Sequence, residues 1–479
     1  MTDTPADSNP VAAVAKAADV ATGVSRAGVI GISVGVLAAG AAAGVAIERL
    51  TVGRAMRRRA RAELEATAPY GSLRGRPLTV AAPDGTGLYV ELDGTGWDEP
   101  DGDRDGDRPE PKGRAGAERE ERGGLRNAGV GATTVGTGSE RSGGERASTG
   151  PEPLTVVFSH GYCLNQDSWH FQRAALREGM RLVFWDQRSH GRSERSRSYL
   201  AGEPAGIDQL GGDLKAVIDA VAPTGPLVLV GHSMGGMTVM ALADQHPELF
   251  RERVAGVALV GTLAGDWNDV SLGLPRAGAK LFKRVAPGVV KLLGRQVELV
   301  EASRRIGSDV AAVFYRRFSF GSRDVDPGVV RFAEQLLDAT PIDVVAEFYP
   351  VFGAHEKYEA LAALRGLPAL VLAGTKDLLT PSAHSETMAE RLPGAELVLV
   401  EGAGHLVLLE RPELVDHELA LLVRRAADFA GAAPLPPAVL ELAADSAEPT
   451  EPAEPAEPTE SAGPSGATGA SGEAAVDPA

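Results

Sequence analysis

This sequence has one cysteine, few aromatic residues and fewer basic than acidic residues. The one cysteine, Cys163, excludes an intrachain disulfide and a zinc site built from several cysteines. With 65 Asp and Glu against 48 Lys and Arg, the formal net charge is −17, so no nucleic-acid partner is expected, because phosphate neutralisation needs clustered basic residues. Aromatics make up only 5% of the 479 residues, whereas glycine (58) and proline (32) are abundant, so part of the chain is not expected to fold.

An uncharged apolar run covers residues 27–47, and it has about the length that a helix needs to cross a bilayer. A cluster of arginines that begins at Arg49 follows the run and indicates that this side faces the cytoplasm. We therefore expect a disordered N-terminus (1–26), a transmembrane helix (27–47), a basic juxtamembrane linker (48–77) and a membrane-anchored protein whose remaining chain is cytoplasmic. The alternatives are a soluble leader on a cytoplasmic protein and a cleaved signal peptide, which the long lead-in disfavours.

Two further segments have the composition of disordered chain. Apolar runs around Pro83-Asp84-Gly85 predict a β-hairpin over residues 78–92, and the Gly-, Asp-, Arg- and Glu-rich stretch at 93–150 predicts a disordered insertion. Residues 431–479 are rich in Pro, Ala, Glu and Thr, and from residue 441 they supply −9 of the net charge. We expect a disordered acidic tail there, which is solubilising or, alternatively, binds a partner.

Between these segments, short apolar runs alternate with helical patterns. The expected strands are 155–159, 182–185, 227–230, 254–260, 369–373 and 397–400, and the expected helices are 207–221, 237–246, 383–391 and 412–430. Strands that are apolar on both faces and separated by helices predict an α/β fold with a mostly parallel sheet flanked by helices. The core would comprise 151–262 and 367–430, and the Phe- and Tyr-rich residues 263–366 would form a helical cap insertion.

The motif Gly231-His232-Ser233-Met234-Gly235 follows an apolar strand and opens a small-residue helix. This context is typical of a nucleophile elbow, a tight turn on which the serine projects from the end of the sheet. The glycines remove Cβ atoms that would meet neighbouring backbone. Ser233 is therefore the candidate nucleophile.

A serine hydroxyl needs a base, and the loops after the last two strands supply one. His405 follows the strand at 397–400 on a glycine-rich loop, and Asp377 follows the strand at 369–373. We expect Asp377 to orient the imidazole and His405 to accept the serine proton; Glu401 and Asp416 are the alternative acids.

Two backbone N–H groups should stabilise the oxyanion of the intermediate. One belongs to Met234, directly after the nucleophile, and the other to Tyr162, in the loop after the strand at 155–159. His160 in that loop is expected to brace it rather than to transfer protons.

These blocks resemble the α/β-hydrolase superfamily, in its serine esterase, lipase and perhydrolase-like branch. They are His160-Gly161, the stretch 186–193 (DQRSHGRS), the Ser233 elbow, and Asp377 with His405, in that order along the chain. The stretch 186–193 is similar to the D-x-R-G-H-G-x-S turn of that branch, with Ser189 in the place of the usual glycine. The resemblance implies the α/β-hydrolase fold and a structural role for this turn.

The expected activity is cleavage of carboxylic esters or related acyl substrates through a Ser-His-Asp triad and an acyl-enzyme. The alternatives are a perhydrolase or carbon–carbon bond hydrolase on the same triad, and a membrane-tethered binding protein that lacks catalysis. No cofactor is expected. No metal site is expected either, because the histidines outside the motifs lack the spacing of metal ligands.

Overall fold

The computed structural model describes residues 69–97, 134–135, 151–294 and 316–444. Its nine-stranded sheet has the strand order β3-β1-β2-β5-β4-β6-β7-β8-β9. The strands are β1 (Arg76–Ala81), β2 (Gly87–Gly94), β3 (Thr134–Val135), β4 (Thr155–Ser159), β5 (Arg181–Trp185), β6 (Leu227–His232), β7 (Val254–Val260), β8 (Ala369–Gly374) and β9 (Glu396–Val400). Strands β4 to β9 run parallel, while β2 is antiparallel to both β1 and β5.

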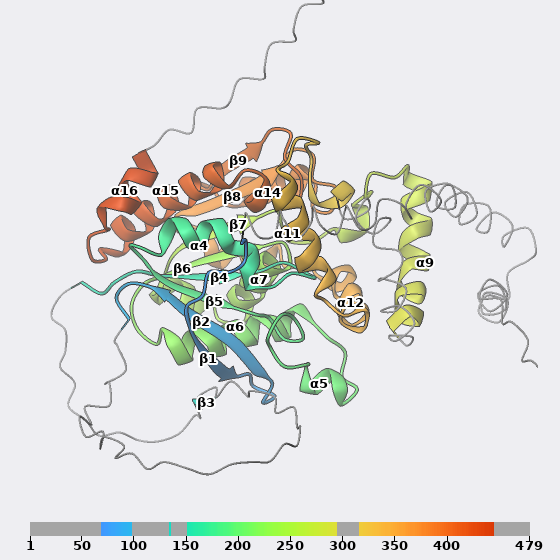
Figure 1. The fold of residues 1–479 in the computed structure, drawn as a ribbon, viewed down its shortest axis with the longest axis horizontal. Coiled ribbons are helices and arrows are strands. Elements are labelled where there is room, and N and C mark those ends of the chain that lie inside the picture. Colours follow the sequence, from blue (N-terminus) through green and yellow to red (C-terminus); the bar gives the residue numbers. More distant parts are fainter. Residues whose placement is uncertain (1–68, 98–133, 136–150, 295–315, 445–479) are drawn as a thin grey trace, which may run out of the picture.

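Helices cover both faces of this sheet (Figure 1). The core elements are α4 (His170–Leu176), α6 (Ile207–Val221), α7 (Met234–Gln245), α8 (Pro247–Glu252), α13 (Ser382–Arg391), α14 (Val407–Glu410) and α15 (Pro412–Ala430). Helices α6, α7 and α13 share one buried cluster with the sheet, and α4, α14 and α15 share the other. The sheet is therefore a middle layer, as the prediction of a doubly covered parallel sheet required.

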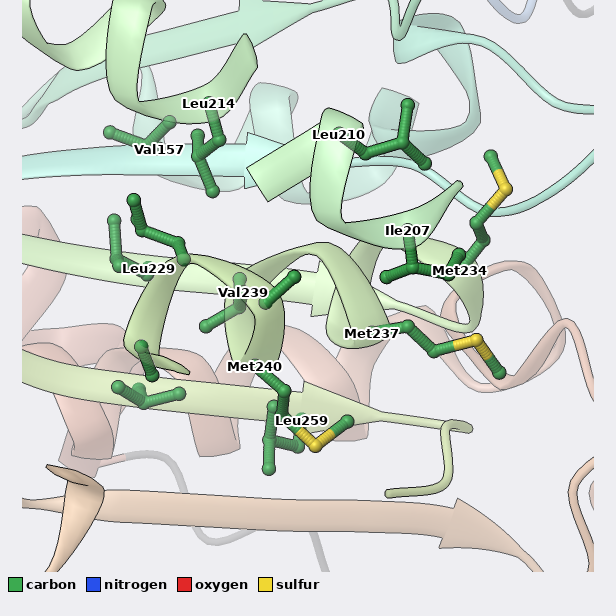
Figure 2. Close-up of a cluster of buried hydrophobic side chains, with 14 of the residues drawn as sticks. Val157, Ile207, Leu210, Leu214, Leu229, Met234, Met237, Val239, Met240 and Leu259 are labelled. Carbon is green, nitrogen blue, oxygen red and sulfur yellow. The ribbon is translucent and has the colours of Figure 1, made fainter. Parts of the chain in front are cut away.

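Alternate residues along the strands enter opposite clusters. Val157 of β4 packs under α6, while its neighbours Val156 and Phe158 face the α15 side. Figure 2 shows Leu210 and Leu214 of α6 in the same apolar cluster as Val157. Burial on both faces explains why these strands are continuous apolar runs rather than alternating ones.

The predicted core strands and helices agree with the structure to within three residues at each end. The largest difference is at α7, which begins at Met234 rather than at residue 237. The cap is helical, as predicted: it contains α9 (Arg276–Gly294), α11 (Pro327–Asp338), α12 (Ile342–Phe348) and the 3-10 turns η2 (Trp267–Asp269), η3 (Tyr349–Ala354) and η4 (Glu359–Leu364). Helix α11 packs into the α15-side cluster through Phe332 and Leu336.

The structure corrects two predictions, the disordered tail at 431–479 and the linker at 48–77, in the parts of these segments that it describes. Helix α16 (Pro437–Ala444) lies within the predicted disordered tail and packs on α15, because Val439 and Ala443 are apolar at helical spacing and become buried. The predicted linker 48–77 includes the start of β1 and Tyr70, whose ring contacts Phe332.

Most of the remaining calls on the termini and the insertion lie outside the described residues. This applies to 1–26, to the transmembrane prediction at 27–47, to most of 93–150 and to 445–479. Within the insertion, β3 pairs with β1 in parallel. The prediction of disorder was therefore wrong for this short stretch. Among the described helices, none is both long and apolar enough to span a bilayer.

Candidate active site

Ser233 occupies a strained turn between β6 and α7. Its φ of 52° lies in a region that non-glycine residues rarely adopt, and such strain amounts to about 1–3 kcal/mol. A Cβ on Gly235 would lie 2.1 Å from the carbonyl oxygen of Ser159, and one on Gly231 would lie 2.5 Å from the carbonyl group of Gly235. The turn can therefore form only with glycine at both positions, as the motif predicted.

Hydrogen bonds on both sides hold this turn. The Ser233 N–H donates to the carbonyl of Val260 at 2.9 Å, and the Thr262 hydroxyl donates to the Ser233 carbonyl at 2.7 Å. Both partners lie at or after the end of β7, the neighbouring parallel strand. The serine hydroxyl is thus positioned by backbone that the sheet itself fixes.

The structure brings Ser233, Asp377 and His405 together at the carboxyl edge of the sheet. Nε2 of His405 lies 3.0 Å from Oγ of Ser233, and Nδ1 of His405 lies 2.8 Å from Oδ2 of Asp377. All three residues are buried, with 5–8% of their surface exposed. The alternative acids lie elsewhere: Asp416 accepts a hydrogen bond from Gln172, and Glu401 is exposed.

Thr380 orients the Asp377 carboxylate. The backbone N–H groups of Leu379 and Thr380 donate to Oδ1 at 2.8 Å each, and the Thr380 hydroxyl donates to Oδ2 at 2.7 Å. This hydroxyl also lies 3.2 Å from Nδ1 of His405. Sequence reasoning missed Thr380, although a threonine three residues after an aspartate in a turn is a signal for this arrangement.

Glu410 holds the loop that carries His405, and it was also missed. Its buried carboxylate accepts N–H groups from Gly404 at 2.7 Å, Gly321 at 3.0 Å and Ser322 at 2.7 Å. It therefore joins the histidine loop to the segment of the cap insertion that precedes α11. No sequence pattern indicates this contact, because the donors are main-chain groups from two distant segments.

A second histidine supports the first from behind. Nε2 of His232 lies 3.0 Å from the carbonyl oxygen of His405, and the two rings are 4.9 Å apart. Burial, with a smaller contribution from His405, lowers the pKa of His232 to about 3. His232 is thus neutral at ordinary pH and places no positive charge beside His405.

Of the two predicted oxyanion donors, Met234 follows Ser233 in the chain and Tyr162 lines the same cavity as Ser233. Met234 is the first residue of α7, where N–H groups have no partner within the helix and the helix dipole favours negative charge. Tyr162 follows Gly161, and a Cβ on Gly161 would lie 3.2 Å from Cβ of Ser233. Because this backbone passes so close to the serine, both assignments remain compatible with the geometry.

The Tyr162 side chain reaches into the cap. Its hydroxyl donates to the carbonyl of Val345 in α12 at 2.6 Å, and its ring packs against Phe352. Burial raises the pKa of Tyr162 well above its ordinary value, so the hydroxyl stays protonated as a donor.

His160 braces the loop before Tyr162, as expected from the sequence. Its Nδ1 lies 2.8 Å from the carbonyl oxygen of Gly161, and its Nε2 accepts the N–H of Gln187 at 2.9 Å. Burial lowers the pKa of His160 to about 3, which fits an imidazole that is one donor and one acceptor.

The 186–193 turn is an internal support rather than a part of the pocket lining. The Asp186 carboxylate accepts the N–H groups of Gln166 and Arg192 at 2.8 Å each. Arg188 is buried and bonds to Asp213 and Asp84. Burial raises the pKa of Asp186 to about 6.

A cavity of about 260 Å³ opens above Ser233 and His405. Its walls are almost wholly apolar or aromatic: Tyr162, Cys163, Leu164, Met237, Trp267, Leu272, Phe282, Phe318, Ser319, Leu337, Tyr349, Phe352, Leu379, Thr380 and Leu406 complete the lining. Several cap aromatics thus line the cavity, whereas Phe320, Phe332 and Phe348 pack into the core. Among the described residues, no group of His, Cys, Asp or Glu side chains is arranged to hold a metal ion.

A mostly parallel sheet between two helical layers, with a serine turn and a polar relay at its carboxyl edge, is the architecture of the α/β hydrolases. The chain belongs to the alpha/beta hydrolase fold family, which matches residues 155–412. The family and fold that the sequence motifs predicted are therefore confirmed.

Similar proteins include enzymes with several activities. The chain is 26% identical over 286 residues to the dihydrolipoyllysine-residue acetyltransferase component of an acetoin cleaving system of Pseudomonas putida. The match covers 59% of this chain and 66% of that protein, so the chain spans a little under two thirds of that relative's length. It is 28% identical over 293 residues to an sn-1-specific diacylglycerol lipase of Mus musculus, covering 57% and 86%. A solved thermophilic esterase of Thermogutta terrifontis is similar at 22% identity with a TM-score of 0.49, covering 73% of this chain and 98% of that one.

Proposed function

We propose that this protein is a serine hydrolase that cleaves carboxylic esters or related acyl compounds through an acyl-enzyme. The observation that carries the proposal is the continuous relay from Oγ of Ser233 through the His405 ring to the Asp377 carboxylate, at 3.0 and 2.8 Å. This relay is buried at the base of an apolar cavity, where a small-molecule substrate can reach it.

In this proposal, Oγ of Ser233 attacks the substrate carbonyl carbon while Nε2 of His405 accepts the hydroxyl proton. Asp377 holds the Nδ1–H tautomer and stabilises the imidazolium that forms. The N–H groups of Met234 and Tyr162 stabilise the oxyanion. His405 then protonates the leaving alcohol, and water attacks the acyl-enzyme by the same proton path in reverse.

The cavity favours an uncharged, apolar group on the substrate. Among the described residues, the lining includes one imidazole, that of His405, and no Lys, Arg, Asp or Glu. Because a charged substrate group would lose its hydration there without gaining a partner, we expect anionic or cationic acyl groups to be poor substrates. The relative named as an sn-1-specific diacylglycerol lipase supports the same choice.

The test is labelling with a fluorophosphonate probe, which reacts with activated serines. The Ser233→Ala variant should lose all labelling and ester hydrolysis. Ser319 lines the same cavity and is also buried, so Ser319→Ala is a matched control that should keep both. Labelling that persists in Ser233→Ala would refute the assignment, and correct folding without any acyl, peracid or carbon–carbon cleavage activity would favour a binding protein.

A further inference from the structure

Helix α9 exposes an apolar face on the outside of the cap. Leu281, Val285, Val289 and Leu292 follow one another at spacings of four, four and three residues, which places them on one side of a helix. Their exposed fractions are 63, 43, 46 and 49%. Such a contiguous apolar face on a protein surface marks an interaction site.

A different side of α9 packs against the molecule. Ala279 and Ala286, seven residues apart, are each only 7% exposed, and α9 lies against α12. The apolar face is therefore not the side that the helix uses for its own packing. In Figure 1, α9 stands at the edge of the described part of the molecule.

The charged residues of α9 are all basic. Arg276, Lys280 and Arg284 recur every four residues and are exposed, whereas Lys283 donates to the carbonyl of Trp267. The helix contains no Asp or Glu, although the whole chain carries a net charge of −17. Basic charge is thus concentrated beside the apolar face.

An occupant of this surface has to offer apolar contact to one side of α9 and negative charge to the neighbouring side. The acidic residues 445–479 could pair with the basic side, but they are poor in large apolar residues and would leave the apolar face uncovered. The apolar residues 27–47 could cover the apolar face, but they contain no acidic group. An anionic lipid surface offers negative headgroups above hydrocarbon, which matches an amphipathic helix with a basic polar side.

The apolar face is continuous with the cavity. Phe282 adjoins it on α9, is 41% exposed, and also lines the cavity above Ser233. Trp267 lines the same cavity and lies against Lys283. A surface that covers this face therefore lies next to the cavity wall.

We propose that α9 is a docking helix for an anionic lipid surface, with its apolar face in the interface and Arg276, Lys280 and Arg284 at the headgroups. The docked protein presents the cavity wall at Phe282 to the lipid. The proposal concerns a surface and does not depend on which residue is the nucleophile.

The experiment is hydrogen–deuterium exchange of the full chain, followed at residues 276–294. Vesicles of phosphatidylcholine with phosphatidylglycerol should slow exchange in α9, and vesicles of phosphatidylcholine alone should not. Replacing Leu281, Val285 and Val289 together by Gln should raise the lipid concentration for half-maximal slowing about 100-fold, at roughly fivefold for each half-buried aliphatic side chain. Lys280→Gln with Arg284→Gln should raise it about 25-fold, at roughly fivefold for each basic residue.

Controls separate this proposal from others. Leu200→Gln on α5 (Arg197–Leu200), where Leu200 is 68% exposed, and Arg424→Gln on α15 should leave the α9 response unchanged. Ser233→Ala should dock like the wild type, and the α9 variants should hydrolyse a short soluble ester normally. An exchange rate at 276–294 that does not change with anionic vesicles would overturn the proposal. Slowing that depends only on protein concentration would also overturn it, because it would indicate that a second copy of the chain covers the face.

Discussion

Glu410 offers a sharp test of how the histidine loop is held. We consider Glu410→Gln, which removes one charge and keeps the size and shape of the side chain. Glu410 is 6% exposed and its two carboxylate oxygens accept three backbone N–H groups, from Gly404, Gly321 and Ser322. Glutamine has one acceptor oxygen and one NH2 group, so it cannot satisfy all three donors.

The expected loss follows from those three bonds. If the amide oxygen faces Gly404 and Gly321, the NH2 group faces the N–H of Ser322, and one hydrogen bond to a charged acceptor is lost, at about 1.5–3 kcal/mol. The two remaining bonds become neutral and weaken by about 1 kcal/mol each. The free energy of unfolding should fall by about 3–5 kcal/mol, which lowers Tm by about 10 °C.

Activity should fall as well, because Gly404 directly precedes His405. A shift of the imidazole by about 1 Å from Ser233 reduces the rate on the order of 100-fold. The measurements are Tm by calorimetry and kcat on a short p-nitrophenyl ester. We expect kcat to fall more than KM changes, because the loop positions the base rather than the substrate.

Glu401→Gln is the matched control. Glu401 lies four residues before His405, is exposed, and loses the same charge. Its free energy of unfolding should change by no more than about 0.5 kcal/mol, as is typical of surface substitutions. Its Tm should therefore stay close to that of the wild type. A wild-type Tm and kcat in Glu410→Gln would refute the reasoning, and loss of activity in Glu401→Gln instead would reassign the triad acid.

Two further predictions test the turn and the core. Gly235→Ala puts a Cβ 2.1 Å from a β4 carbonyl oxygen and should abolish folding or activity, whereas Gly353→Ala, which meets nothing within 4 Å, should not; soluble yield and Tm compare them, and a stable, active Gly235→Ala would contradict the packing. Burial raises the pKa of Asp416 to about 7, so the folded protein keeps a proton that the unfolded chain releases from about pH 4. The free energy of unfolding should therefore fall as pH rises from about 4 to 7, by up to about 4 kcal/mol. Asp416→Asn should lose that slope in urea unfolding at pH 5 and 8, while its amide can donate to the otherwise unpartnered Oε1 of Gln172; an unchanged slope would assign the pH dependence to other groups.

The parts of the fold that local sequence determines were the parts predicted well. Strands buried on both faces are apolar throughout, and the elbow needs glycines at fixed positions, so both leave a readable pattern. Ser233, Asp377 and His405 were predicted to meet because each lies within five residues after the end of a strand, and parallel strands end at one edge.

Contacts between distant segments left no such pattern. Glu410 acts on main-chain N–H groups, which every residue except proline carries, so its partners could not be inferred. Helix α16 was missed because the composition of residues 431–479 as a whole masks a short apolar stretch at its start. The acceptor of the Tyr162 hydroxyl, the carbonyl of Val345, is likewise distant along the chain. Thr380, in contrast, follows Asp377 by three residues and left a local signal.

The D-x-R-G-H-G-x-S turn of the α/β hydrolases has glycine where this chain has Ser189. Contacts of Ser189 with the cap explain this difference. Ser189 keeps the φ of 64° that glycine would adopt easily, at a strain of about 1 kcal/mol. Its hydroxyl lies 2.9 Å from Oε1 of Glu347 on α12, and Arg195 donates to the other oxygen of that carboxylate at 2.8 Å. Arg195 also pairs with Asp343 of α12, and the Tyr162 hydroxyl donates to the carbonyl of Val345, so Ser189, Arg195 and Tyr162 all bond to this helix. Helix α12 also packs against α9. The Tyr162 bond therefore ties the cap to the loop that supplies the proposed oxyanion donor. A glycine at position 189 would relax the turn but leave Glu347 with fewer donors in a buried site, so the strain and the hydrogen bond are parts of one arrangement.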